Sequence, residues 1–245
     1  MPTAQRGKYA NLLDCWQKVR FQEQRLAVSV PRKKAMSQIL FLHGFGQTER
    51  DSTPQVKALR TALPCSPILA PTYHPGGSVE ATRVSVALAG LSEHLKSASG
   101  RTTHLVGYSF GGLLCALLAE RHPELVDRVL LLAPAIDNYA RNYAGKDQAD
   151  WQMPIDFAVD LSTYPERPSI KRPTTLVHGL LDNDHGGSAP WRIEEWAKQE
   201  RFAAVHLLSG VDHSLEPWLS QSPERDAGCS AFASLARNAL GYHAP

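Results

Sequence analysis

The chain has 245 residues, of which 43% are hydrophobic and 20% are charged, and its formal net charge is +2. This length and composition fit one folded domain with a sizeable core and exclude a disordered or fibrous chain. The small net charge gives no whole-chain reason to expect nucleic-acid binding. No stretch approaches the roughly 20 apolar residues that a membrane-spanning helix needs, so we expect no stable membrane insertion.

Residues 1–35 are predicted to be a basic N-terminal extension. Residues 1–36 carry eight Lys and Arg side chains against two acidic ones. Helical spacing of apolar residues predicts a helix over 9–21, and alternation over 26–30 predicts a short strand. Charged residues interrupt every apolar run, so we expect no secretory signal peptide. The four cysteines lack metal-like spacing, which favours reduced thiols and a cytoplasmic location.

Three interpretations of this extension remain open. In the first, the extension is an additional helix that docks on the body. In the second, it makes a weak contact with acidic surfaces. In the third, it lies upstream of the natural start of the protein, which is Met36. The abrupt change of sequence character at Met36 keeps the third interpretation in place.

From residue 36 to 245, short apolar runs alternate with helical patterns in one expected domain. The predicted strands cover residues 37–42, 68–70, 103–107, 128–133, 174–177 and 204–208. The predicted helices lie around residues 56–63, 78–97, 110–121, 190–201 and 224–240, with Ser188 as the cap of the fourth. The strands are apolar throughout, which is typical of an α/β fold whose mostly parallel sheet is covered by helices on both faces.

Residues 137–170 interrupt this alternation. They separate two clear strands and contain five aromatic residues. A segment of this length without strand character is predicted to be a short helical cap insertion.

Residues 107–111 have the pattern G-x-S-x-G between a predicted strand and a predicted helix. In this context the pattern predicts a sharp turn that holds Ser109 in a strained conformation, with its hydroxyl clear of the sheet. Gly107 and Gly111 leave room where side chains would collide with the turn. Ser109 is therefore our candidate nucleophile. In the following helix we interpret Cys115 as a small buried hydrophobe.

A serine hydroxyl needs a base, and His213 follows the final predicted strand. Loops beyond the carboxyl ends of strands are where sites form in open α/β sheets. We interpret His104 and His206, which lie inside strands, as structural. His74 is interpreted as an ordinary loop histidine rather than a residue at the rim of a pocket.

The base in turn needs a carboxylate that holds its tautomer. Asp182 follows the strand over 174–177, and the order Ser, Asp, His suits it. Asp184 stands two residues further on and remains the alternative. Asp212 adjoins His213, but neighbouring residues on a loop rarely point the same way.

An oxyanion needs two backbone N–H donors. Phe110 follows the nucleophile directly and is expected to supply one. The loop after the strand over 37–42 is expected to supply the other, from the N–H of Phe45. For His43 we expect a structural hydrogen bond that shapes this loop.

Four features thus occur in chain order: HGFG over 43–46, GYSFG over 107–111, HGLLD over 178–182 and VDH over 211–213. Together they resemble the α/β-hydrolase superfamily over about residues 37–240, most closely its small bacterial esterase-like serine hydrolases. The resemblance implies a cap after the sixth strand, Ser109 as nucleophile, Asp182 as acid and His213 as base. It also implies two leading antiparallel strands, for which residues 26–30 are the one candidate. Serine in place of aspartate at the turn argues against cleavage of carbon–halogen bonds.

The expected activity is hydrolysis of a carboxylic ester through an acyl-enzyme. We expect a small-molecule acyl substrate, no cofactor, no metal and no nucleic-acid partner, and the oligomeric state stays open. The aromatic residues of 137–170 either line an apolar acyl pocket or pack the cap on the sheet. A thioesterase, a carbon–carbon bond hydrolase and a non-catalytic ligand-binding protein on the same fold remain alternatives.

Overall fold

A computed structural model describes residues 37–47, 53–98, 101–136, 155–182, 188–219 and 231–242. All of them lie in one compact unit that spans Ala35–Pro245. The predicted extension over 1–35, its helix and its strand lie outside the described residues. Most of the predicted cap, residues 137–154, lies outside them as well.

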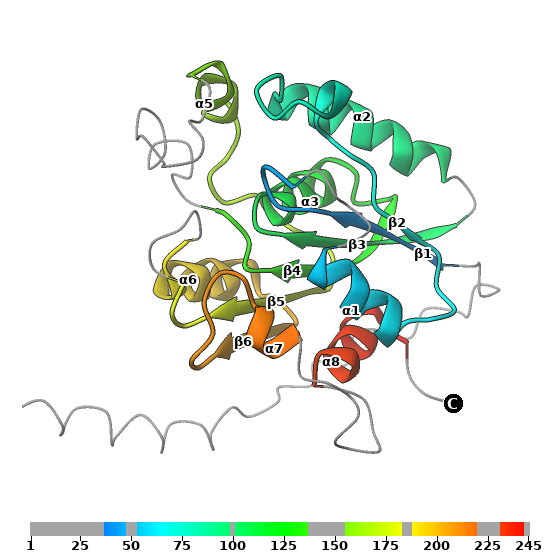
Figure 1. The fold of residues 1–245 in the computed structure, drawn as a ribbon, viewed down its shortest axis with the longest axis vertical. Helices are drawn as coiled ribbons and strands as arrows, with labels where there is room; N and C mark the ends of the chain where they lie inside the picture. The colour runs from blue at the N-terminus through cyan, green and yellow to red at the C-terminus, as the bar shows by residue number, and fades with distance from the viewer. Residues whose placement is uncertain are drawn as a thin grey trace, which may run out of the picture. The chain divides into compact units, whose positions relative to one another are not determined.

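The described residues form one sheet of six strands, in the order β2-β1-β3-β4-β5-β6, and every neighbouring pair is parallel (Figure 1). The predicted α/β class and mostly parallel sheet are confirmed. The strands are β1 (Ser37–Leu42), β2 (Ile68–Leu69), β3 (Thr102–Tyr108), β4 (Val126–Leu132), β5 (Thr174–Gly179) and β6 (Ala204–Leu208).

The four inner strands β1, β3, β4 and β5 are continuously apolar because both faces of the sheet are covered there, whereas the edge strands β2 and β6 are partly exposed. In β1, Leu40 and Leu42 belong to one buried cluster, whereas Ile39 and Phe41 belong to another. Successive side chains of a strand point to opposite faces, so one strand contributes to both clusters. Burial on both faces removes the polar alternation of a half-exposed strand.

Helices cover each face of the sheet (Figure 1). α2, α3, α5 and α6 contribute to the cluster that contains Leu40, and α1, α7 and α8 contribute to the cluster that contains Ile39. The helices are α1 (Pro54–Ala62), α2 (Val84–Ser97), α3 (Phe110–Arg121), α5 (Ile155–Leu161), α6 (Pro190–Glu200), α7 (Glu216–Leu219) and α8 (Ala231–Leu240), and η2 (Pro75–Gly77) is a short 3₁₀ turn. No helix among the described residues is long and apolar enough to cross a membrane.

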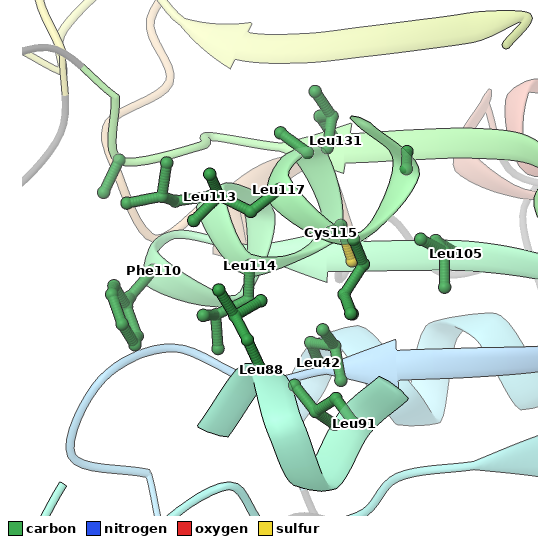
Figure 2. Close-up of a cluster of buried hydrophobic side chains, with 14 of the residues drawn as sticks. Leu42, Leu88, Leu91, Leu105, Phe110, Leu113, Leu114, Cys115, Leu117 and Leu131 are labelled. Atoms are coloured by element: carbon green, nitrogen blue, oxygen red, sulfur yellow. The ribbon is translucent and has the colours of Figure 1, made fainter. Parts of the chain in front are cut away.

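Helix α3 lies at the centre of the first cluster. Its residues from Phe110 to Ala119 are all buried, so its sequence shows little helical periodicity. Figure 2 shows Leu114 and Cys115 of α3 together with Leu42 of β1 and Leu91 of α2. Complete burial raises the pKa of the Cys115 thiol well above its ordinary value, which confirms Cys115 as a small buried hydrophobe.

One predicted helix start and one predicted cap are wrong, whereas the predicted start of α6 at Pro190 is confirmed. Helix α2 begins at Val84 rather than near residue 78, and the Thr82 hydroxyl before it donates to the Ser78 carbonyl at 3.2 Å. The N-cap of α6 is Ala189 rather than Ser188. The Ser188 hydroxyl instead bonds the buried backbone of Ile136, which lies outside the helix.

Helix α5 is the described part of the region predicted to be a cap. Arg83, next to the start of α2, lies 2.7 Å from the Asp156 carboxylate of α5. The Asp160 carboxylate accepts a hydrogen bond from the Ser85 N–H at 2.9 Å. α5 therefore supplies the first turn of α2 with a carboxylate acceptor that the sequence before α2 lacks.

Candidate active site

Ser109 stands at the turn between β3 and α3. Its backbone has φ 54° and ψ −121°, a conformation that residues with a side chain rarely adopt. Two glycines make the turn possible by their lack of a side chain. A Cβ on Gly107 would lie 2.3 Å from the Gly111 carbonyl oxygen, and a Cβ on Gly111 would lie 2.1 Å from the Leu42 carbonyl oxygen. The predicted strained turn and the predicted need for both glycines are confirmed.

Backbone hydrogen bonds hold Ser109 in this conformation. Its N–H donates to the Leu132 carbonyl at 2.9 Å, and its carbonyl accepts from the N–H of Ala135 at 3.0 Å and of Gly112 at 2.9 Å. Strained residues persist where the surrounding structure over-determines them. The end of β4 and the start of α3 therefore fix the direction in which the Ser109 hydroxyl points.

The structure brings Ser109, His213 and Asp182 into one chain of contacts. The Ser109 Oγ lies 2.9 Å from His213 Nε2, and His213 Nδ1 lies 2.8 Å from Asp182 Oδ2. Both distances are those of good hydrogen bonds. The Asp182 side chain is fully buried, and that of His213 is 17% exposed.

The loops after β5 and β6 meet through their backbones. A Cβ on Gly179 would lie 2.3 Å from the Val211 carbonyl oxygen, so only glycine allows this approach. The same carbonyl accepts a hydrogen bond from the Leu181 N–H at 2.9 Å. This contact sets Asp182, at the end of one loop, beside His213, at the end of the other.

Of the two other candidate carboxylates, the structure describes only Asp212. Asp212 faces its own loop, where one carboxylate oxygen accepts hydrogen bonds from the N–H and the hydroxyl of Ser214. The hydroxyl of Ser214 is the main reason that the pKa of Asp212 lies below its ordinary value. The expectation that Asp212 points away from the imidazole agrees with these bonds. Asp184 lies outside the described residues.

The loop over 43–47 passes directly against the turn at Ser109. A Cβ on Gly111 would lie 2.4 Å from the His43 carbonyl oxygen, and the rings of Phe45 and Phe110 lie 5.5 Å apart. His43 Nδ1 is 2.9 Å from the Gly44 carbonyl oxygen, which agrees with the structural hydrogen bond expected for this residue. The two residues whose N–H groups are candidates for an oxyanion hole are thus neighbours across the loop.

The interpretation of His74 as an ordinary loop histidine is wrong. Its side chain is buried, its Nδ1 lies 2.6 Å from the Thr82 hydroxyl, and its ring packs against Tyr73 and Phe45. Burial, and then the charge of His43, lowers the pKa of His74 to about 4. The sequence predicted helix from residue 78 onward. It therefore did not predict that residues 72–83 form a loop in which the Thr82 hydroxyl contacts the His74 ring.

Phe157 of α5 is fully buried against Phe45 and Phe110, with ring centroids 4.8 and 5.3 Å away. This supports the interpretation that the aromatic residue packs α5 on the body. The Tyr164 ring lies partly buried, with the Arg121 guanidinium 5.0 Å from its centre. The other aromatic residues of 137–170 lie outside the described residues.

Two residues next to the candidate triad had no role in the sequence interpretation. Tyr108 precedes Ser109, and its ring centroid lies 5.4 Å from that of His213. Burial, and then the Asp182 charge, raises the pKa of Tyr108. His178, in β5, has its Nε2 3.4 Å from Asp182 Oδ2. The spacing of four residues between His178 and Asp182 in HGLLD could have predicted their contact. The position of Tyr108 directly before Ser109 could have predicted its place beside the site.

Other histidines make structural contacts. His104 is buried in β3, with its Nδ1 3.6 Å from the Asp127 carboxylate, and His122 Nε2 lies 2.9 Å from the Ser92 hydroxyl. Over the described ranges, no group of three His, Cys, Asp or Glu side chains is arranged to hold a metal ion.

Comparison with known proteins identifies this arrangement as the α/β-hydrolase fold. A sequence profile described as alpha/beta hydrolase fold matches residues 95–163, which include the turn at Ser109. Solved structures match most of the chain, so the resemblance to this superfamily is confirmed and the chain has the α/β-hydrolase fold. No match is found among curated protein sequences.

The solved structures that resemble the chain include Est1E from Butyrivibrio proteoclasticus with ferulic acid bound, at a TM-score of 0.64 and 18% identity, covering 85% of this chain and 91% of that one. Alpha/beta hydrolase domain-containing protein 10 from mouse has a TM-score of 0.62 and 15% identity, covering 86% and 90%. A structure from the metagenome-derived lipolytic enzymes LipS and LipT has a TM-score of 0.60 and 15% identity, covering 86% of this chain and 95% of that one. At such identities the likeness shows the fold alone.

Proposed function

We propose that this protein is a serine hydrolase that cleaves a carboxylic ester through an acyl-enzyme. Ser109 is the nucleophile, His213 the general base and Asp182 the acid that orients it. The observation that carries the proposal is the contact chain from Ser109 Oγ to His213 Nε2, at 2.9 Å, and from His213 Nδ1 to Asp182 Oδ2, at 2.8 Å. Nucleophile, base and orienting group within hydrogen-bond reach are the signature of an activated hydroxyl.

The contacts support a defined tautomer of the base. An ionised Asp182 only accepts hydrogen bonds, so His213 carries its proton on Nδ1 and presents a lone pair on Nε2. That lone pair faces the Ser109 hydroxyl and takes its proton as the Oγ attacks. The imidazolium that forms is stabilised by the fully buried Asp182 carboxylate.

The reaction proceeds in two halves. Ser109 Oγ bonds to the carbonyl carbon, His213 passes the proton to the departing alcohol, and an ester of Ser109 remains. Water then attacks this ester, gives a proton to His213, and the acid leaves as the proton returns to Ser109 Oγ. In each half the oxyanion accepts hydrogen bonds from the N–H groups of Phe45 and Phe110, which the contact between their loops supports.

A small-molecule acyl ester is the substrate class that we propose. The Phe45 ring packs against the fully buried rings of Phe110 and Phe157, so the loop that carries one proposed oxyanion donor lies against an apolar cluster. The ferulic acid described for the Est1E structure is an aromatic acid, which is a reason to include hydroxycinnamate esters in a substrate test.

The first experiment is labelling with a fluorophosphonate probe at neutral pH. We expect one adduct on Ser109 in the wild-type protein and none in Ser109→Ala, located by peptide mass spectrometry. A wild-type protein that stays unlabelled would rule out the hydrolase and favour a ligand-binding protein on the same fold.

The second experiment separates the substrate classes that the same residues can serve. A panel combines p-nitrophenyl esters of rising chain length, a hydroxycinnamate ester and matched acyl-CoA thioesters. We expect the highest kcat/KM with an ester. A preference for the thioesters, or labelling without turnover of either class, would redirect the proposal to a thioesterase or a carbon–carbon bond hydrolase.

A further inference from the structure

His178 is a fully buried histidine of β5 that lies beside the Asp182 carboxylate. Its side chain is 0% exposed, and its Nε2 lies 3.4 Å from Asp182 Oδ2. The Nε2–Oδ2 contact is longer than a good hydrogen bond, Asp182 Oδ1 has no hydrogen-bond partner among the described residues, and the backbone of Ser188 interacts with the His178 ring. Two fully buried polar side chains in contact are costly to desolvate, so the place of this imidazole beside the Asp182 carboxylate is the feature to explain.

The contact falls on the carboxylate oxygen that also meets the base. Asp182 Oδ2 lies 2.8 Å from His213 Nδ1 and 3.4 Å from His178 Nε2. A carboxylate oxygen has two lone pairs and can accept from both imidazoles. His178 therefore touches the orienting group of the base without touching Ser109 or the reacting atoms.

Burial keeps His178 neutral. Desolvation lowers the pKa of His178 below its ordinary value and the charge of His213 lowers it further, while the Asp182 charge and a backbone hydrogen bond with Ser188 oppose this. A neutral imidazole with its proton on Nε2 attracts the carboxylate but leaves the whole negative charge for the imidazolium of His213. A cationic group at this position would compete with His213 for that charge.

We propose that His178 is a positioning residue that holds the Asp182 carboxylate toward His213 by directing its Nε2 proton at Oδ2. This inference rests on the proposed function, because it assigns His178 a role in that same site. His178 acts on the reaction through Asp182 and His213 only.

The test compares His178→Leu, which removes both nitrogens, with His178→Gln, whose amide N–H can take the place of Nε2–H. The readout is the rate at which a fluorophosphonate labels Ser109, measured against pH. We expect His178→Leu to lower the limiting rate about tenfold, which is the size of effect seen when a metal-bound histidine loses its outer hydrogen-bond partner. We expect its acid limb to shift to higher pH, because a carboxylate without this donor holds the proton on His213 more strongly. His178→Gln should restore most of the rate and the wild-type acid limb.

His104→Leu is the matched control. His104 is also a buried strand histidine near a carboxylate, with its Nδ1 3.6 Å from Asp127, but it lies outside the site. We expect this variant to keep the wild-type pH profile. If His178→Leu keeps it too, the inference is wrong while the proposed function stands. If His178→Leu fails to fold by circular dichroism, His178→Asn replaces it, since its amide reaches only the Nδ1 position, and an unshifted profile there overturns the inference.

A second readout does not depend on labelling. The His213 Nδ1–H in its bond to Asp182 should give a far-downfield proton resonance in the ¹H NMR spectrum, absent from Asp182→Asn. We expect this resonance to move in His178→Leu and to return in His178→Gln. If the wild-type protein is not labelled, the proposed function fails, and an unmoved resonance separately overturns the role of His178.

Discussion

Ser109, Asp182 and His213 come from three separate loops, and each depends on a different local device. A strained backbone conformation holds Ser109. The close approach of Gly179 to Val211 brings Asp182 beside the loop of His213. The Gln55 side chain of α1 donates a hydrogen bond at 3.4 Å to the carbonyl of Ser214, the residue after His213. The side chains meet because parallel strands end at one edge of the sheet. Single substitutions at these residues therefore test the chemistry with little effect on the core.

Ser109→Ala tests the nucleophile. The change removes one oxygen and adds none, so we expect turnover and labelling to disappear while the fold stays intact. Measurement of hydrolysis and of thermal unfolding checks both parts. Residual labelling of the same peptide would move the nucleophile to another residue.

Asp182→Asn tests the acid. An amide in place of the carboxylate favours the wrong tautomer of His213, so we expect kcat to fall on the order of 10⁴-fold, as in other Ser-His-Asp sites. Asp184→Asn is the matched variant, and we expect it to lose far less. Steady-state kinetics of both variants decide the assignment, and the reverse order of activities would transfer the role to Asp184.

At the scale of elements, the contact between β1, β3 and α3 controls the site. Helix α3 is buried along almost its whole length, and its first turn lies against the carbonyls of Leu42 and His43. The turn at Ser109 and the loop that carries Phe45 are therefore in direct backbone contact. A change in the spacing between these elements affects both the nucleophile and a proposed oxyanion donor.

Gly111→Ala tests this coupling. Its Cβ would lie 2.1 Å from the Leu42 carbonyl oxygen, a backbone atom, so β1 or the turn must shift. We expect a loss of stability of about 2 kcal/mol or more, in the range of other overpacked cores, and a large loss of labelling at Ser109. Urea denaturation and probe labelling measure the two effects.

Gly90→Ala is the control for that substitution. Gly90 lies in α2, and a Cβ there would have no atom within 4 Å. Alanine in a helix is favoured over glycine by roughly 0.5–1 kcal/mol, so this variant should be slightly more stable and fully labelled. Equal behaviour of the two variants would contradict the role of close packing at Gly111.

At the scale of the whole molecule, buried neutral histidines tie stability to pH. Burial lowers the pKa of His104 and His178, and that of His74 to about 4. In the unfolded chain a histidine titrates near 6.5. Between pH 6.5 and about 4 the unfolded chain therefore binds protons at His74 that the folded protein does not, so the free energy of unfolding falls as the pH falls.

Urea denaturation between about pH 7 and pH 4 checks this dependence. We expect stability to be level above pH 6.5 and to decline below it. His74→Asn keeps a group that can bond the Thr82 hydroxyl but cannot be protonated, so its decline should be shallower. An equal decline in this variant would mean that other groups control acid unfolding.

Much of the fold was predictable because its signals are local. Apolar runs identified the six strands of the described sheet, and strand, turn and helix around Ser109 identified the nucleophile turn. Misjudged features depended on distant partners. Helix α2 begins at Val84 rather than near residue 78 because residues 78–83 form a loop whose Thr82 hydroxyl contacts His74. The Ser188 hydroxyl bonds the backbone of Ile136 instead of capping α6.

The sequence by itself determined the α/β class, the order of the site residues along the chain and the position of Ser109 in a strained turn. Only the tertiary structure decided that His213 faces Asp182, that Asp212 turns to its own loop, and that His178 touches the same carboxylate from β5. The physical reason is the separation along the chain over which each kind of interaction acts. Hydrophobic period and turn chemistry act between near neighbours in the chain, whereas contacts between side chains on separate loops depend on how the strands that carry them pack.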